Sequence, residues 1–182
     1  MERRRFSAAL QGQNLRFTGA GEGGSARARV GFLLLEHFSL PAFTQALDTL
    51  VTANLIRSES FAVSNFSLSG EPVTSDLGLL ICPDLALASA ARQGLDLLVV
   101  CGGLRTPLRS SAALREALQD VAARGVALAG LWNGAWFLGD AGLLDGYRCC
   151  IHPEHRAALA EIARNSQVTS DSYMVDRDRL TA

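Results

Sequence analysis

The segment Gly130-Leu131-Trp132-Asn133-Gly134 follows an apolar run, opens a helical pattern and decides the fold. Glycines at both ends of such a segment let a strand turn sharply into a helix and hold the middle side chain beyond the sheet edge. Enzymes that use this turn place Ser or Cys at its centre, whereas Trp132 has no ionisable proton and cannot form an acyl intermediate. The segment therefore predicts the strand-to-helix turn of an enzyme without the nucleophilic residue. This combination indicates a pocket that binds a ligand without reacting with it.

Three apolar runs predict the strands that surround this elbow, at residues 30–35, 95–101 and 126–131. Continuous apolar runs are typical of strands covered on both faces, and helical patterns separate them. This alternation predicts an α/β fold in which a parallel sheet lies between two layers of helices. Ligands bind such sheets beyond the carboxyl ends of the strands, where both Gly102-Gly103 and the elbow are found.

Weaker patterns predict the remaining elements. Pro41 suits the first turn of a helix, Ser110 or Ser111 can cap a second helix that Gly125 ends, and Pro153 opens a third. We also expect a strand at 61–68 that turns at residues 70–72 into a hairpin partner over residues 73–81, outside the main sheet. A short strand at 148–151 and a last strand at 167–175 complete the expected elements.

The composition is that of one globular domain, with 182 residues, 48% of them hydrophobic, and a formal net charge of −1. This charge argues against a general polyanion binder, and no apolar stretch approaches the ~20 residues of a membrane span. Residues 1–27 lack periodicity, so we predict a disordered tail before one domain over residues 28–182. The four cysteines have no metal-ligand spacing, so we expect reduced thiols, a cytoplasmic protein and no metal or cofactor.

Three segments and one histidine have a familiar order: Val99-Val100-Cys101-Gly102-Gly103, Gly130-Leu131-Trp132-Asn133-Gly134-Ala135, Ala141-Gly142-Leu143-Leu144-Asp145-Gly146 and His152. Together they resemble the DJ-1/PfpI domain, whose flavodoxin-like, class I glutamine amidotransferase-like fold is a three-layer parallel-sheet sandwich. More narrowly, they resemble its version in GlxA-like AraC-family transcriptional regulators. Residues 131–136 and 151–155 are similar to segments of the members that sense glycine betaine and carnitine.

The resemblance assigns the catalytic positions of the family to residues of this chain. Catalytic members carry Cys where this chain has Trp132, and the acidic residue that tunes their Cys aligns with Ala42. His152 lies where catalytic members place a histidine, and Gly102-Gly103 corresponds to part of the oxyanion hole. Because nucleophile and carboxylate are both absent, the resemblance argues against glutaminase, protease, glyoxalase or deglycase activity.

The same crevice is expected to bind a quaternary amine or an amino-acid-like zwitterion. The indole of Trp132 offers a face to an alkylammonium, worth ~0.5–2 kcal/mol, although the residue could instead plug a decayed site. Amides at the start of the elbow helix suit a carboxylate. The predicted ligand contacts are Phe38, Ser39, Gly102, Gly103, Trp132, Asn133, Gly134 and His152. Loop packing is the alternative for Phe38 and Ser39, and helix capping is the alternative for His152.

We therefore expect the non-catalytic sensor domain of an AraC-family regulator, forming homodimers. In such regulators a C-terminal AraC-type domain binds DNA. We expect that domain to be absent here, and we expect the chain to stop before the last helix of the DJ-1-like domain. The alternative is a DJ-1/PfpI-type hydrolase, amidase or glyoxalase-like enzyme that uses Cys101 or Ser39 as an atypical nucleophile. A third possibility is a non-functional fragment.

Overall fold

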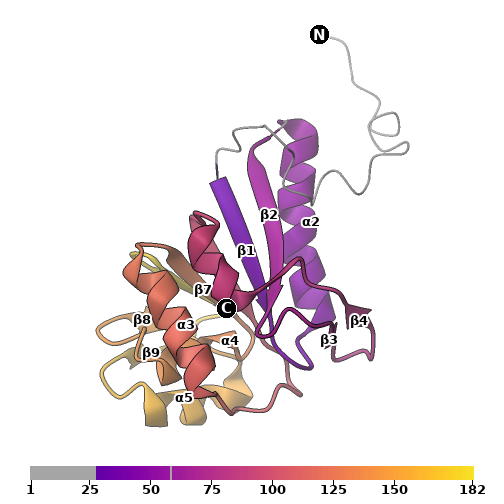
Figure 1. Cartoon of the computed structure of the whole chain (residues 1–182). Helices are drawn as coiled ribbons and strands as arrows, with labels where there is room; N and C mark the ends of the chain where they lie inside the picture. Colours follow the sequence, from indigo (N-terminus) through magenta and orange to yellow (C-terminus); the bar gives the residue numbers. More distant parts are fainter. Residues whose placement is uncertain (1–27, 58) are drawn as a thin grey trace.

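The computed structural model describes residues 28–57 and 59–182, so the predicted tail over residues 1–27 lies outside the described part. Its centre is a seven-stranded sheet with the order β10-β11-β7-β6-β1-β2-β5. Figure 1 labels β1, β2 and β7 of this sheet. Every neighbouring pair from β11 to β5 is parallel, and β10 joins the edge antiparallel to β11. These strands are β1 (Ala28–Leu34), β2 (Phe61–Ser67), β5 (Leu85–Ala86), β6 (Leu97–Cys101), β7 (Ala127–Leu131), β10 (Met174–Asp176) and β11 (Arg179–Thr181).

Helices cover both faces of this sheet, which confirms the predicted three-layer architecture. The helices are α2 (Leu40–Ile56), α3 (Ala112–Ala123), α4 (Gly134–Asp140) and α5 (Arg156–Ile162), with the 3-10 turns η2 (Leu87–Arg92) and η3 (Pro153–His155). Alternate residues of β1 divide the core: Phe32 packs with the side chains of α2, and Leu33 packs with those of α3, α4 and α5. No helix in residues 28–57 or 59–182 is long and apolar enough to cross a membrane.

The helix starts follow the sequence signals closely. Pro41 lies in the first turn of α2, and the hydroxyl of Ser111 accepts a hydrogen bond from the Leu114 amide at 3.1 Å, which caps α3. Pro153 opens η3 rather than a longer helix, so α5 begins only at Arg156.

Two small sheets lie outside the main one. β3 (Val73–Thr74) and β4 (Leu80–Ile81) form an antiparallel hairpin with each other, and β8 (Arg148–Cys149) pairs in parallel with β9 (Gln167–Val168). Residues 73–81 lie outside the main sheet as predicted, but their predicted pairing with the strand at 61–68 is wrong, because β2 pairs in parallel with β1 and β5. The single last strand predicted over 167–175 is wrong. Its alternating polarity combines two separate strands, because β9 ends at Val168 and β10 starts only at Met174.

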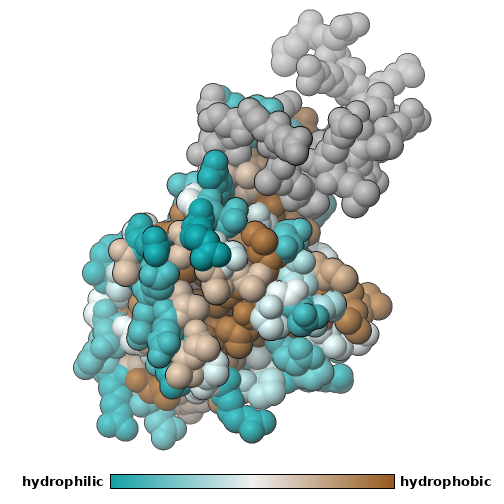
Figure 2. All heavy atoms as spheres, viewed as in Figure 1, coloured by the Kyte–Doolittle hydropathy of each residue, from teal (hydrophilic) through white to brown (hydrophobic). Residues whose placement is uncertain are grey.

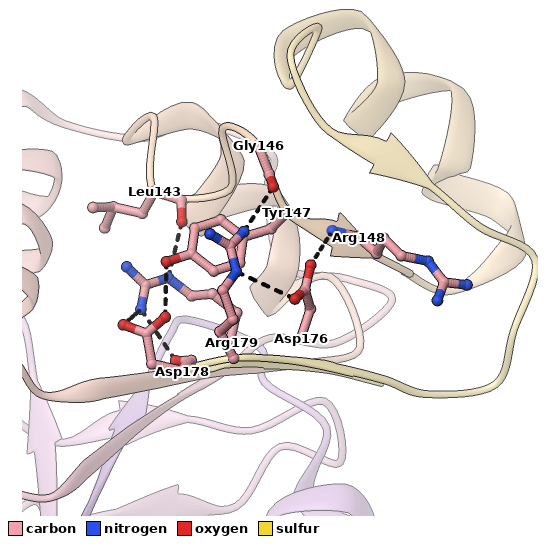
Figure 3. A network of polar contacts seen from close by, with 8 residues as sticks. Leu143, Gly146, Tyr147, Arg148, Asp176, Asp178 and Arg179 are labelled. Carbon is pink, nitrogen blue, oxygen red and sulfur yellow. Dashed lines mark hydrogen bonds and ion pairs between the residues drawn. The ribbon is translucent and has the colours of Figure 1, made fainter.

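The β10–β11 hairpin is held to the rest of the domain by a buried arginine (Figure 3). Arg179 is 7% exposed, donates to the Leu143 carbonyl at 2.9 Å and forms an ion pair with Asp178 at 2.7 Å. The Tyr147 hydroxyl donates to the same carboxylate at 2.7 Å, which lowers the pKa of Asp178 and raises that of Tyr147. The guanidinium of Arg177 lies 3.7 Å from the centre of the Tyr147 ring. We call this group the C-terminal clamp.

Replacing the buried arginine tests the clamp. Arg179→Met keeps most of the side-chain volume but leaves the Leu143 carbonyl without its partner and removes the ion pair with Asp178, so we expect the free energy of unfolding to fall by about 2–3 kcal/mol. Urea denaturation followed by circular dichroism measures this change. The control is Arg124→Met, since Arg124 forms only an exposed pair with Asp120 on α3 and should cost less than about 0.5 kcal/mol. Equal losses in the two variants would contradict the clamp.

Candidate functional site

The elbow predicted from sequence is present between β7 and α4. β7 ends at Leu131, Trp132 follows with a φ of 57°, and α4 begins at Gly134. A non-glycine residue in this left-handed region is strained by about 1–3 kcal/mol, and such strain is common at functional sites. The Trp132 amide donates to the Ala182 carbonyl at 2.7 Å, which ties the turn to the residue after β11.

Two glycines let the end of β6 touch this elbow. A Cβ added to Gly102 would overlap the Asn133 side-chain oxygen and lie 2.8 Å from the Gly134 amide nitrogen, and one added to Gly134 would overlap the Val100 carbonyl. Gly102 also donates to the Leu131 carbonyl at 3.2 Å. The turn after β6 and the elbow, both expected at the carboxyl ends of strands, therefore meet in direct backbone packing.

The loop after β1 joins the same assembly. The Ser39 amide donates to the Gly102 carbonyl at 2.9 Å, and a Cβ on Gly103 would lie 2.6 Å from both the His37 carbonyl oxygen and the Ser39 amide nitrogen. The carboxyl ends of β1, β6 and β7 thus meet in one place, as expected for neighbouring parallel strands.

Trp132 and His152 are the predicted contacts that reach the surface, where both are partly exposed. Their rings stack with centroids 4.5 Å apart and planes 12° apart. His152 makes no side-chain capping bond to η3, so stacking replaces the capping role considered from sequence. The imidazole of His152 therefore covers one face of the indole. The rest of the Trp132 side chain is the part of the elbow that solvent can reach.

The other predicted contacts are buried, which corrects their assigned roles. Phe38 is 0% exposed and meets the Phe43 ring edge-on at 5.6 Å, so it packs in the core instead of forming a cage wall. Ser39 is 4% exposed, and Asn133 is fully buried with its amide donating to the Thr106 carbonyl at 3.2 Å. Gly102, Gly103 and Gly134 are buried as well, so these residues form the frame of the elbow and offer no open surface to a carboxylate.

The alternative nucleophiles are also inaccessible. Cys101 is 1% exposed, and burial raises the pKa of its thiol far above the ordinary value. A neutral, buried thiol is a poor nucleophile because the thiolate is the reactive form. Ala42, where the resemblance expects an acidic residue, lies half-buried in the first turn of α2.

Sequence reasoning missed a pocket beside this frame. It has a volume of about 340 Å³ and opens near the carboxyl ends of β1 and β2, and it is lined by Leu35, Glu36, Glu71, Thr106, Arg109 and Phe137 among others. Neither Trp132 nor His152 lines it. No motif could have revealed it, since its walls come from segments far apart in the chain.

A helix-covered parallel sheet with a glycine-framed elbow at its carboxyl edge defines the fold class. The sequence model of the DJ-1/PfpI family matches residues 30–182, and the chain belongs to this family. A crystal structure of an AraC family transcriptional regulator from Pseudomonas putida superposes with a TM-score of 0.80 at 57% identity, covering 85% of this chain and 83% of that one. A ThiJ/PfpI family protein from Pseudomonas syringae gives a TM-score of 0.74 at 27% identity, covering 85% and 62%.

Characterised relatives include transcriptional regulators. The HTH-type transcriptional regulator GbdR of Pseudomonas aeruginosa is 34% identical over 154 residues, which are 84% of this chain and 41% of GbdR. The regulator CdhR of the same species is 35% identical over 152 residues, which are 83% of this chain and 44% of CdhR. The chain therefore spans less than half the length of these relatives.

Thiol labelling tests whether Cys101 is available as a nucleophile. Cys82 is exposed, whereas Cys101, Cys149 and Cys150 are buried and burial raises the pKa of each. We expect Ellman's reagent at neutral pH to react quickly with Cys82 alone, the rest reacting only after unfolding. Cys82→Ser should remove the fast phase and Cys101→Ala should leave it unchanged. A fast phase that Cys101→Ala abolishes would show a reactive thiol at the sheet edge.

Proposed function

We propose that this chain is the small-molecule-sensing part of a transcriptional regulator and that it carries out no covalent chemistry on its ligand. The observation that carries this proposal is Trp132 at the elbow, held with a φ of 57° and stacked on His152. The indole occupies the position where catalytic members of the family carry a reactive thiol, and an indole cannot attack a substrate. Trp132 nevertheless has the strained backbone conformation that presents a side chain beyond the sheet. This strain favours a role in ligand binding over a side chain that only fills the space of a former active site.

The proposed role in transcriptional regulation is supported by the proteins that this chain resembles. GbdR and CdhR are named HTH-type transcriptional regulators, and the Pseudomonas putida structure with 57% identity is an AraC family transcriptional regulator. Since this chain matches less than half of GbdR, DNA binding would belong to a segment outside the matched region. In this proposal the domain described here supplies the effector response, and a separate domain reads the DNA.

The ligand chemistry follows from what the elbow exposes. A partly exposed indole attracts an alkylammonium through its π face, and methyl groups on the nitrogen add apolar contact without needing hydrogen-bond acceptors. A quaternary amine such as glycine betaine, carnitine or choline fits this surface better than a primary amine does. Since Asn133 and Gly134 are buried, the carboxylate of a zwitterion would remain near the mouth of the site, towards solvent.

A homodimer remains part of the proposal. Apolar side chains gather at the tip of the β3–β4 hairpin, where Leu77, Leu79 and Leu80 are between 56% and 64% exposed (Figure 2). Exposed apolar clusters of this kind mark interaction surfaces in soluble proteins. A second copy of the chain covering this hairpin would remove these leucines from water.

A thermal-shift screen tests the proposed ligand class. We expect at least one of glycine betaine, carnitine, choline and dimethylglycine to raise the melting temperature, because ligand at a hundredfold excess over Kd stabilises the folded state by about 2.7 kcal/mol. Trp132→Ala should weaken binding by about 2- to 30-fold, the equivalent of ~0.5–2 kcal/mol of cation–π attraction.

Trp132→Phe is the matched control, because it keeps an aromatic face at the elbow and should retain most of the affinity. Binding that is unchanged in Trp132→Ala would exclude the indole as the contact. Failure of all these amines to stabilise the wild-type chain would contradict the proposed ligand class.

A further inference from the structure

The 340 Å³ pocket near the carboxyl ends of β1 and β2 has walls of two kinds. Leu34, Leu35, Pro72 and Phe137 contribute apolar surface, while Glu36, Glu71 and Arg109 contribute charges. Its volume lies in the range of small-molecule sites, which combine apolar walls with a few placed polar groups. We call this the β1–β2 pocket.

The strand order of the main sheet shows which segments form the walls of the β1–β2 pocket. β1 lies between β6 and β2, so the segment after β1 lies between the loop after β6 and the turn after β2. Arg109 therefore comes from the wall on the β6 side, Glu71 comes from the wall on the β2 side, and Glu36 comes from the segment between them. The guanidinium of Arg109 and the carboxylates of Glu36 and Glu71 line the same pocket, and this combination suits a ligand that carries charges of both signs.

Internal hydrogen bonds hold these walls in place. The Ser67 hydroxyl donates to the Glu71 carbonyl at 2.8 Å and accepts from the Gly70 amide at 2.9 Å, which fixes the turn after β2. The His37 amide donates to the Thr74 carbonyl at 2.8 Å, which ties the segment after β1 to the β3 strand. A pocket with walls fixed in this way binds its ligand at a lower cost in conformational entropy.

One buried hydroxyl in the lining of the pocket has no hydrogen-bond partner in the described part of the chain. Thr106 lines the pocket and is 5% exposed, and its hydroxyl makes no hydrogen bond to any atom in the described part of the chain. The hydroxyls of Ser67 and Ser111, which also line the pocket, are used within their own loops. Buried polar groups are almost always satisfied in folded proteins, so an orphaned hydroxyl in a pocket wall points to a ligand atom as its partner.

We infer that the β1–β2 pocket is a second ligand site that takes a small zwitterion with a primary ammonium group and an aliphatic body, as in an aliphatic amino acid. Arg109 would pair with the ligand carboxylate, for which its planar fork of donors is suited. Glu36 and Glu71 would accept hydrogen bonds from the ammonium group, which a quaternary amine cannot donate. The leucine, proline and phenylalanine side chains would surround the aliphatic part.

This site goes beyond the proposed function, because it shares no lining residue with the exposed elbow pair Trp132 and His152. Its ligand also differs in chemistry. The elbow offers a π face to methylated nitrogen, whereas the β1–β2 pocket offers carboxylates to an ammonium that donates hydrogen bonds. The two sites can therefore be tested separately in the same chain.

Isothermal titration calorimetry with L-leucine as the probe tests the inference. We expect one L-leucine per chain, with affinity falling by about tenfold or more for 4-methylpentanoate, which lacks the amine, and for 3-methylbutylamine, which lacks the carboxylate. Arg109→Glu should lower the affinity for L-leucine by about tenfold or more, and Thr106→Val should lower it severalfold because the hydroxyl partner is lost.

Control variants show whether a loss of L-leucine binding is caused by the change in the pocket or by a change of charge at any position. Arg124→Glu makes the same charge change at an exposed position directly after α3 and outside the pocket, and should leave L-leucine binding unchanged. Trp132→Ala should also leave it unchanged. Absence of L-leucine binding at concentrations up to about 10 mM, or equal binding by wild type and Arg109→Glu, would overturn the pocket inference. Amine binding that Trp132→Ala weakens would leave the proposed function standing in that case.

Discussion

The ends of β1, β6 and β7 lie so close together that a side chain at Gly102 or Gly134 would overlap neighbouring backbone or the Asn133 amide group. This close approach fixes the elbow and forces Trp132 into the left-handed region with a φ of 57°. It also buries most residues around the turn, so that the indole and the stacked His152 ring are what the elbow presents to solvent. The character of the site therefore depends on backbone packing that only glycine permits.

The sequence predicted the parts of the fold that local patterns determine. The buried parallel strands and the elbow depend on apolar periodicity and on glycine spacing, and the structure contains both. The predicted pairing of the strand at 61–68 with residues 73–81 failed, because β2 lies inside the parallel sheet and β3 pairs with β4. The strand predicted at 167–175 failed because polarity alternates through β9, an exposed connection and β10 without marking where one strand ends. Arg177, with a φ of 54° at the turn between β10 and β11, gave no turn signal because it is neither glycine nor asparagine.

The candidate site was less predictable, since exposure depends on tertiary packing. Phe38 and Asn133 occur at the expected edge of the sheet, but the first packs on Phe43 and the second hydrogen-bonds to Thr106. The β1–β2 pocket was missed because Glu36, Glu71 and Arg109 lie far apart in the chain and belong to no motif. Phe137 of α4 lines that pocket, while the same helix begins at the elbow, so one short helix contacts both proposed ligand sites.

We propose that the domain recognises a ligand without transforming it. Turnover by the purified chain with glutamine, methylglyoxal and a peptide substrate, each followed against a buffer blank, tests this proposal. We expect no product above the blank, because an indole occupies the elbow and burial keeps the Cys101 thiol neutral. Product formation by the wild-type chain that Cys101→Ala abolishes would contradict it.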